Sequence, residues 1–236
     1  NFFCYYIRDR LGSSVSKGLG VDFQKSRPSI VFYNGEYFGI HNIRERSTEY
    51  YFETNYGLDP ENIDLLKADN SASNGSAQDY EQMISYLETN GATSSEHYEK
   101  IKQWMDVDNF INYLHTEIFA NNRDWPSNNL KKWRSSSPVT KWKWFLYDLD
   151  FGWGNEYSEF DNNIFEFTLT DSGPSWPNGP ASTFLQRTLM QNEEFKSAFI
   201  NRFSVLLVTY FSPGILKEKI DAMMNEINAE IPRDQE

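Results

Sequence analysis

The stretch NNRDWPSNNLKKW holds residue types that could take part in phosphoryl transfer. It contains Asp124, and Asn129 follows five positions later. Moving a γ-phosphoryl group requires a carboxylate that accepts the proton of the attacking hydroxyl, together with hard oxygen ligands for divalent metal ions. Protein kinases place the base Asp and a metal-binding Asn at this spacing. The stretch therefore predicts a catalytic loop.

A second stretch, FLYDLDFGWG, contains Asp148 and Asp150 and comes about twenty residues after the first. In protein kinases, a hairpin separates the catalytic loop from a later Asp that binds metal. If the strand before Asp148 continues, the two carboxylates face the same way, because side chains two positions apart share a face. These residues alone leave open which Asp is the main metal ligand.

Periodic segments on both sides of Asp124 predict the elements that hold it. The segment 107–120 has apolar residues at helical spacing, and Asp106 or Asp108 can cap its start. Residues 130–147 predict two strands joined by a turn, and the second strand becomes fully apolar as it would on entering a core. The sequence thus predicts a helix, a loop and a hairpin.

The remaining segments predict further helices and strands that do not alternate. Asn34-Gly35 between two apolar runs predicts a tight hairpin turn, and Ser47 and Gly57 mark the two ends of a short helix. The other expected elements are a helix in 2–19, a strand near 61–68, a polar loop at 69–78, helices at 78–90 and 95–104, an irregular segment at 155–182, and C-terminal helices with Pro213 in a first turn. This segregated order favours an α+β fold.

Composition excludes several classes of protein. The 236-residue chain has a net charge of −12, so a general nucleic-acid surface is not expected. The acidic surface serves solubility or attracts a basic protein. The single cysteine, Cys4, rules out an intrachain disulfide and a cysteine-based zinc site. No apolar run reaches the roughly 18 residues of a membrane span.

Three stretches together resemble the CotH kinase family of atypical kinases, named for a spore-coat protein. They are RPSIVFYNGEYFGIHNIRER, NNRDWPSNN and KWFLYDLDFGWG, and the resemblance runs from about residue 1 to residue 220. It implies an atypical protein-kinase-like fold, with a small mixed β N-lobe and a largely helical C-lobe that carries a catalytic β-hairpin. On this basis we expect residues 1–46 to form a partial N-lobe and residues 47–236 the C-lobe, within one continuous domain.

The resemblance also implies an activity and roles for individual residues. The expected reaction is transfer of the ATP γ-phosphoryl group to protein Ser or Thr, with Mg or Mn, or alternatively Ca. The expected substrate is a protein, with a basic, Ser-rich chain as one option. A bacterial cell-envelope or secreted location is implied as well. By position, the roles are Asp124 as catalytic base, Asn129 as metal ligand with Asn128 as the alternative register, Asp148 and Asp150 as the metal-binding pair, and Glu45 near the nucleotide.

Some features depart from the kinase pattern. We find no Gly-x-Gly-x-x-Gly motif before the first hairpin, and Lys17 and Lys25 lie in the wrong context for the phosphate-binding lysine. We therefore expect the chain to begin inside the family's domain, with part of the N-lobe missing. Glu45 could alternatively form only a surface salt bridge with Arg44 or Arg46.

Two alternative functions remain open. The first is a catalytically inactive pseudokinase, or an extracellular binding or scaffold module. The second is a metal-dependent hydrolase, which is less well supported because none of His41, His97 and His115 joins the Asp cluster. We interpret His115, on the expected long helix, as a packed or surface residue.

Overall fold

The computed structural model has helices and strands in separate layers, which confirms the predicted α+β class. It describes residues 6–154, 163–170 and 178–234. The strands are β1 (Asp22–Phe23), β2 (Ser26–Tyr33), β3 (Glu36–Arg44), β4 (Ile63–Leu66), β5 (Ala72–Asn74), β6 (Lys131–Ser135) and β7 (Lys143–Leu146). The helices are α1 (Arg8–Val15), α2 (Glu49–Tyr56), the short 3-10 helix η2 (Pro60–Asn62), α3 (Gln78–Asn90), α4 (Ser95–Trp104), α5 (Val107–Ala120), α6 (Ile164–Leu169), α7 (Phe184–Leu189), α8 (Glu193–Val208), α9 (Pro213–Ile227) and α10 (Ile231–Asp234).

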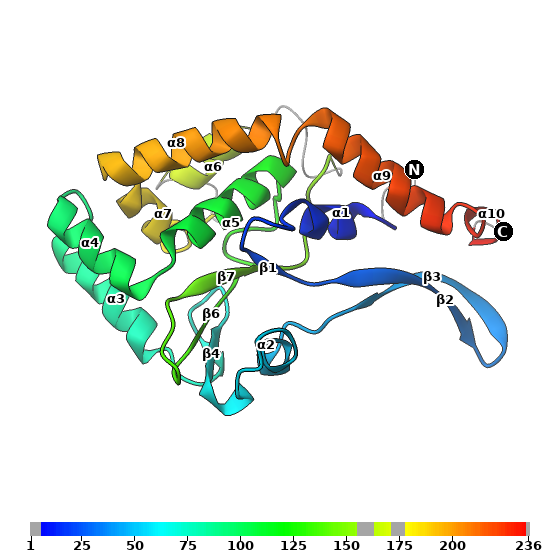
Figure 1. Ribbon diagram of the computed structural model, residues 1–236, viewed down its shortest axis with the longest axis horizontal. Coiled ribbons are helices and arrows are strands. Elements are labelled where there is room, and N and C mark those ends of the chain that lie inside the picture. Colours follow the sequence, from blue (N-terminus) through cyan, green and yellow to red (C-terminus); the bar gives the residue numbers. More distant parts are fainter. Residues whose placement is uncertain (1–5, 155–162, 171–177, 235–236) are drawn as a thin grey trace.

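The main sheet has the strand order β1-β7-β6-β4-β5, and only the β1–β7 pair is parallel. Helix α5 lies between this sheet and α8, and α2 covers the opposite face (Figure 1). Adjacent residues of a strand point to opposite faces. Trp144 packs against Phe110 of α5 at a ring distance of 4.3 Å, whereas Phe145 packs against Tyr51 of α2 at 4.8 Å. The sheet is therefore buried on both faces at β7.

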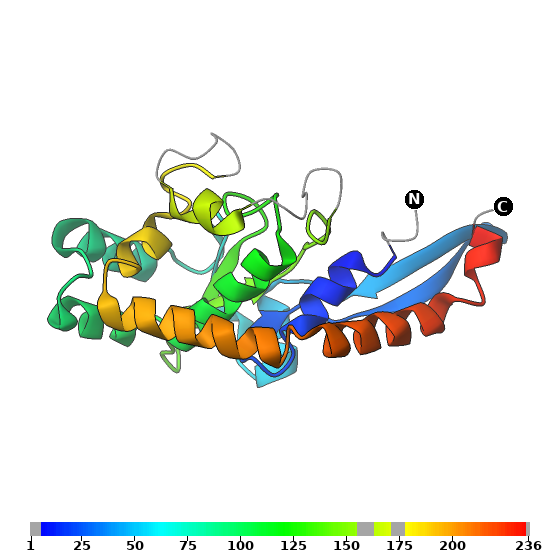
Figure 2. The same cartoon turned by 90° about the horizontal axis from the view of Figure 1, so that it is seen from above.

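The β2–β3 hairpin forms a separate two-stranded sheet that extends away from the main sheet (Figures 1 and 2). Asn34 and Gly35 have φ values of 52° and 86°, which confirms the predicted turn. Helix α10 lies against this hairpin, where Asp234 Oδ1 accepts a 2.8 Å hydrogen bond from the N–H of Ile40. The C-terminal part of the chain thus supports a hairpin from its N-terminal part.

Several predicted boundaries are confirmed. Helices α3 and α4 begin and end at the predicted residues. Of the two proposed caps of α5, Asp106 is the one that accepts a bond, from the N–H of Asn109 at 3.0 Å. Pro213 occupies the first turn of α9, as predicted.

Three local predictions are wrong. Thr48, and not Ser47, occupies the N-cap of α2, because Ser47 accepts a 2.7 Å hydrogen bond from Lys131 instead. The polar loop at 69–78 contains β5, which pairs with the buried strand β4 and gains its regular structure from that pairing. The expected helix in 2–19 begins outside the described residues, and from residue 6 onward it is regular only over α1, since the chain turns before Gly18, which has a φ of 95°.

The predicted irregular segment at 155–182 is only partly described. Its described residues include α6, a short helix capped by Asn163, whose side chain accepts the N–H of Glu166 at 3.2 Å. The prediction is wrong over α6, and the rest of the segment lies mainly outside the described residues.

Over the described ranges, no single helix is long and apolar enough to cross a membrane. Helices α8 and α9 satisfy the length and composition test only as a pair bent by 58°.

Candidate active site

The loop that follows α5 and the loop that follows β7 lie side by side. The main-chain N–H of Trp153 donates a 2.7 Å hydrogen bond to the carbonyl of Ala120, the last residue of α5. Gly152 approaches the same carbonyl so closely that a Cβ atom on it would lie 2.6 Å from the oxygen. The fold thereby brings together the two stretches that the sequence predicts to carry the chemistry.

The carboxylate of Asp124 is held from one side by two amides. Its Oδ2 atom accepts hydrogen bonds from Asn128 Nδ2 at 2.9 Å and from Asn129 Nδ2 at 3.0 Å. Its Oδ1 atom is buried and has no hydrogen-bond partner among the described residues. One oxygen is therefore fixed by two donors, while the other keeps its acceptor capacity unused among the described residues.

Asn129 connects the two loops. Its side-chain nitrogen, which binds Asp124, also lies 3.3 Å from the main-chain carbonyl oxygen of Asp148. Both Asn129 and Asp148 have left-handed backbones, with φ values of 50° and 59°. Such a conformation is uncommon outside glycine, and Asn and Asp tolerate it best. The loop shape itself thus favours these residue types at both positions.

Asp148 and Asp150 do not lie on a continuing strand. Strand β7 ends at Leu146, so the condition under which the two carboxylates would share a strand face is not met. The groups nevertheless influence each other. Burial, then the negative charges of Asp150 and Asp9, raise the pKa of Asp148 to about 6. Negative charge is concentrated here, which favours a bound cation.

The comparison with protein families agrees with this geometry. A family model described as CotH kinase protein matches residues 4–236. The chain belongs to the CotH kinase family. The resemblance inferred from three motifs is confirmed, and the match extends past residue 220, where the motif-based resemblance ended. The comparison with curated proteins gives no match.

Asp9 contacts the candidate site of this CotH kinase family member, a contact that the sequence did not indicate. Its Oδ1 atom accepts a 2.7 Å hydrogen bond from the N–H of Leu149, and its Oδ2 atom lies 3.1 Å from Arg44 NH1. Burial raises the pKa of Asp9, while the charge of Arg44 opposes that rise. Nothing local in the sequence relates α1 to a residue 140 positions away.

Glu117 and Asn122 form a buried support beneath Asp124. Asn122 Nδ2 donates to Glu117 Oε2 at 2.9 Å, and Asn122 Oδ1 accepts the N–H of Asp124 at 3.2 Å. Burial raises the pKa of Glu117 to about 8. The sequence analysis did not identify this link. A signal was present, because Glu117 is an acid inside the apolar pattern of α5.

Glu45 contacts a residue other than the two arginines expected. Its Oε2 atom accepts the N–H of Lys25 at 3.1 Å, and its Oε1 atom lies 3.7 Å from Lys25 Nζ. The salt bridge with Arg44 is not formed, because Arg44 pairs with Asp9. The role of Glu45 near a nucleotide stays a prediction.

In the part of the chain that the structure describes, no group of three Asp, Glu, His or Cys residues could hold a metal ion without other ligands. The predicted ligands Asn128 and Asn129 both use their side-chain nitrogens to hold Asp124. Asp148 approaches these amides through its main-chain carbonyl, which lies 3.3 Å from Asn129 Nδ2. The metal-binding roles of these four residues therefore stay predictions.

Proposed function

We propose that this protein is a kinase that transfers the γ-phosphoryl group of ATP to a serine or threonine hydroxyl of a protein. Membership of the CotH kinase family supports a kinase-like function. The contact of Asn129 with both Asp124 and the Asp148 carbonyl supports the chemistry most directly, because it joins the candidate base to the candidate metal-binding loop.

In this reaction Asp124 would act on the attacking hydroxyl. The Asp124 carboxylate would accept the hydroxyl proton while Asn128 and Asn129 hold its Oδ2 atom in place. The hydroxyl oxygen would form a bond to the γ-phosphorus, and the bond from that phosphorus to the β–γ bridging oxygen would break, releasing ADP. Positioning and charge stabilisation supply most of the catalysis in such transfers.

A divalent cation fits the oxygen-rich chemistry of these residues. Asp148 and Asp150 would hold Mg or Mn, or alternatively Ca, with the Asn129 amide, or that of Asn128, as a further ligand. Magnesium commonly uses one or two carboxylates together with phosphate oxygens and waters, so it does not require three acidic residues. The bound ion would offset negative charge on the phosphate oxygens.

Further features of the proposal follow from the family. The N-lobe-like segment is residues 1–46, the C-lobe is residues 47–236, and Glu45 lies near the nucleotide. A basic, serine-rich protein substrate would suit the net charge of −12. A secreted or cell-envelope location is part of the same proposal.

A thermal-shift titration with ATP, with and without Mg or Mn, tests nucleotide binding. Ligand that binds the native state raises the melting temperature by mass action. We expect a metal-dependent rise that the Asp148→Ala/Asp150→Ala double variant loses. The control double variant Asp108→Ala/Asp221→Ala removes two exposed carboxylates and should keep the rise. A protein that shows neither a rise nor phosphoryl transfer would instead be the inactive binding module.

A further inference from the structure

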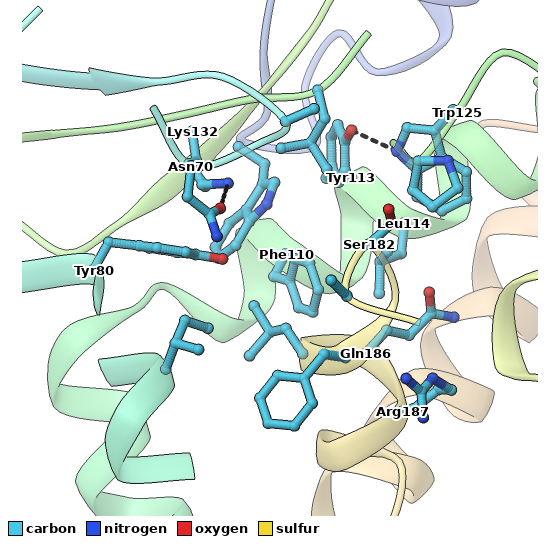
Figure 3. Close-up of a pocket in the computed structure, with 18 of the residues that line it drawn as sticks. Asn70, Tyr80, Phe110, Tyr113, Leu114, Trp125, Lys132, Ser182, Gln186 and Arg187 are labelled. Carbon is cyan, nitrogen blue, oxygen red and sulfur yellow. Dashed lines mark hydrogen bonds between the residues drawn. The ribbon is translucent and has the colours of Figure 1, made fainter. Parts of the chain in front are cut away.

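A cavity is lined in part by Trp125, Pro126 and Leu130 of the candidate catalytic loop, but Asp124 does not line it. It has a volume of about 360 Å³ and is lined by residues of α3, α5, β6, β7 and the segment 180–187. Aromatic rings form much of its wall, among them those of Tyr80, Phe110, Tyr113 and Trp125 (Figure 3), and Trp144 and Phe184 also line it. A volume of this size is typical of sites for small organic molecules.

Lys132 places a buried amine in the wall of this cavity. Its side chain is only 2% exposed, and its amine donates to the carbonyl of Lys67 at 3.1 Å and to Asn70 Oδ1. The amine also lies 4.5 Å from the ring centre of Tyr80. An ammonium group has three donors, so two are committed to neutral oxygens and the third has no hydrogen-bond acceptor among the described residues.

Lys132 forms no ion pair with any described residue, although one carboxylate, that of Glu88, also lines the cavity. By contrast, Arg134 in the same strand is 2.9 Å from Asp64 and also pairs with Asp79. Burial lowers the pKa of Lys132 to about 7, and the negative charge of Asp69 opposes this shift. A buried cation without a counter-charge is costly, and an anion in the cavity would offset that cost.

The position of Arg187, the second cationic residue of the lining, bears on how much negative charge the ligand can carry. Arg187 lines the cavity well away from Lys132, as Figure 3 shows. Its Nε atom donates to Thr183 Oγ1 at 3.1 Å, and its NH2 atom donates to the Pro180 carbonyl. A single buried amine therefore meets the head of the ligand, which suits one carboxylate better than a more highly charged phosphate.

We propose that this cavity binds a compact organic carboxylate with an apolar body, its carboxylate on Lys132 and its body against the aromatic wall. Neutral apolar ligands would leave the amine without a counter-charge, and cations would be repelled by it. The inference is independent of the proposed kinase activity, because none of the residues that carry it belongs to the candidate base or metal site.

Isothermal titration with 3-phenylpropionate and with its uncharged amide, 3-phenylpropionamide, tests the proposal on the wild-type chain. The two probes have nearly the same shape and differ in charge. We expect the acid to bind at least about tenfold more tightly, since hydrogen bonds to charged groups are stronger than neutral ones. Equal affinity for the two probes, or no binding of the acid, would overturn the proposal.

Matched variants locate the binding site. Lys132→Met keeps the length of the side chain and should remove the preference for the acid. Lys131→Met is the control, because the Lys131 amine binds Ser47 and contacts Tyr147 outside the cavity. Ala181→Phe, at an exposed position of the lining, should weaken binding of both probes and provides a second test if Lys132→Met does not fold. A preference for the acid that persists in folded Lys132→Met, or acid binding unaffected by Ala181→Phe, would contradict the assignment.

Discussion

The carboxylate of Asp9 accepts a 2.7 Å hydrogen bond from the main-chain N–H of Leu149, although 140 positions separate the two residues. Leu149 stands between Asp148 and Asp150, the two candidate metal ligands. Asp9 also pairs with Arg44 of β3. One buried carboxylate thus fixes the β7 loop to the first helix and to the hairpin, and it sets the position of the candidate site relative to both.

Removing this carboxylate should weaken both the fold and the site. We expect Asp9→Ala to lower the free energy of unfolding by about 1–3 kcal/mol, because a buried hydrogen bond and an ion pair are lost. The rise in melting temperature with ATP and metal should also shrink. Urea unfolding and thermal shift measure the two effects, with the exposed Asp108→Ala as the control. Unchanged stability would show that Asp9 does not fix the loop.

The proposed role of Asp124 in phosphoryl transfer can be measured separately from the binding of ATP and metal. Asp124→Ala should reduce the rate of phosphoryl transfer by about 10²–10⁴-fold, the typical contribution of general base catalysis. Binding of ATP with metal should remain, because Asp148 and Asp150 are unchanged. Transfer of labelled phosphate and thermal shift report on the two steps. Asp59→Ala, at the start of η2, is the control. Undiminished transfer in Asp124→Ala would disprove its role as base.

Glu117 should make the free energy of unfolding decrease as the pH rises. Burial raises its pKa from 4.5 to about 8, so the folded state retains a proton that the unfolded chain releases. Stability therefore falls as the pH rises between these two values and stays low above about 8. Glu117→Gln remains neutral and should be more stable than the wild type at pH 9 by about 1–4 kcal/mol.

Urea unfolding across the pH range from 5 to 9 measures this difference. The exposed Glu53→Gln variant should follow the wild-type dependence on pH. Parallel curves for the wild type and Glu117→Gln would mean that Glu117 is charged in the folded protein.

His115 should make the free energy of unfolding decrease as the pH falls. It is fully buried against Phe199 and Phe203, at ring distances of 4.2 and 4.9 Å. Burial, then the charge of Arg202, lowers its pKa from 6.5 to about 3. The unfolded chain binds the proton more readily, so stability falls as the pH drops below about 6.5. This confirms the interpretation of His115 as a packed residue.

The variant His115→Leu tests whether His115 causes this loss of stability in acid. Between pH 7 and pH 4 it should lose about 1–3 kcal/mol less stability than the wild type, because it has no proton to bind. His41→Leu, at an exposed position of β3, is the control. An equal acid-induced loss in His115→Leu and the wild type would exclude His115 as the cause.

The close approach of Gly152 to Ala120 gives a steric test. In Gly152→Ala the new Cβ would lie 2.6 Å from the Ala120 carbonyl oxygen, so the loop must shift. We expect a loss of stability of about 1–3 kcal/mol, as for overpacked positions, and weaker ATP binding. Gly214→Ala, in α9, meets no atom within 4 Å and should be neutral or stabilising by up to about 1 kcal/mol. Similar melting temperatures for both variants would contradict the crowding.

Local chemistry in the sequence determined many of the elements. Asn34 and Gly35 tolerate the positive φ that a tight turn requires, so the hairpin was predictable from two residues. The bounds of α3 and α4 follow from apolar spacing and from glycine or serine at their ends. The spacing of Asp124 and Asn129 is likewise local, and their side chains meet at 3.0 Å within one loop. Neighbours in the chain can meet in this way whatever the rest of the fold does.

Only the tertiary structure decided how these parts meet. Strand β7 ends at Leu146, where its pairing with β6 and β1 stops, and this end removed the expected strand geometry of Asp148 and Asp150. The bond of Asp9 to Leu149 and the absence of an ion pair at Lys132 in the described chain also depend on distant elements packing together. Residues far apart in sequence meet only once the core has formed, and no short pattern records that outcome. Composition and spacing therefore indicated the chemistry, while packing set its geometry.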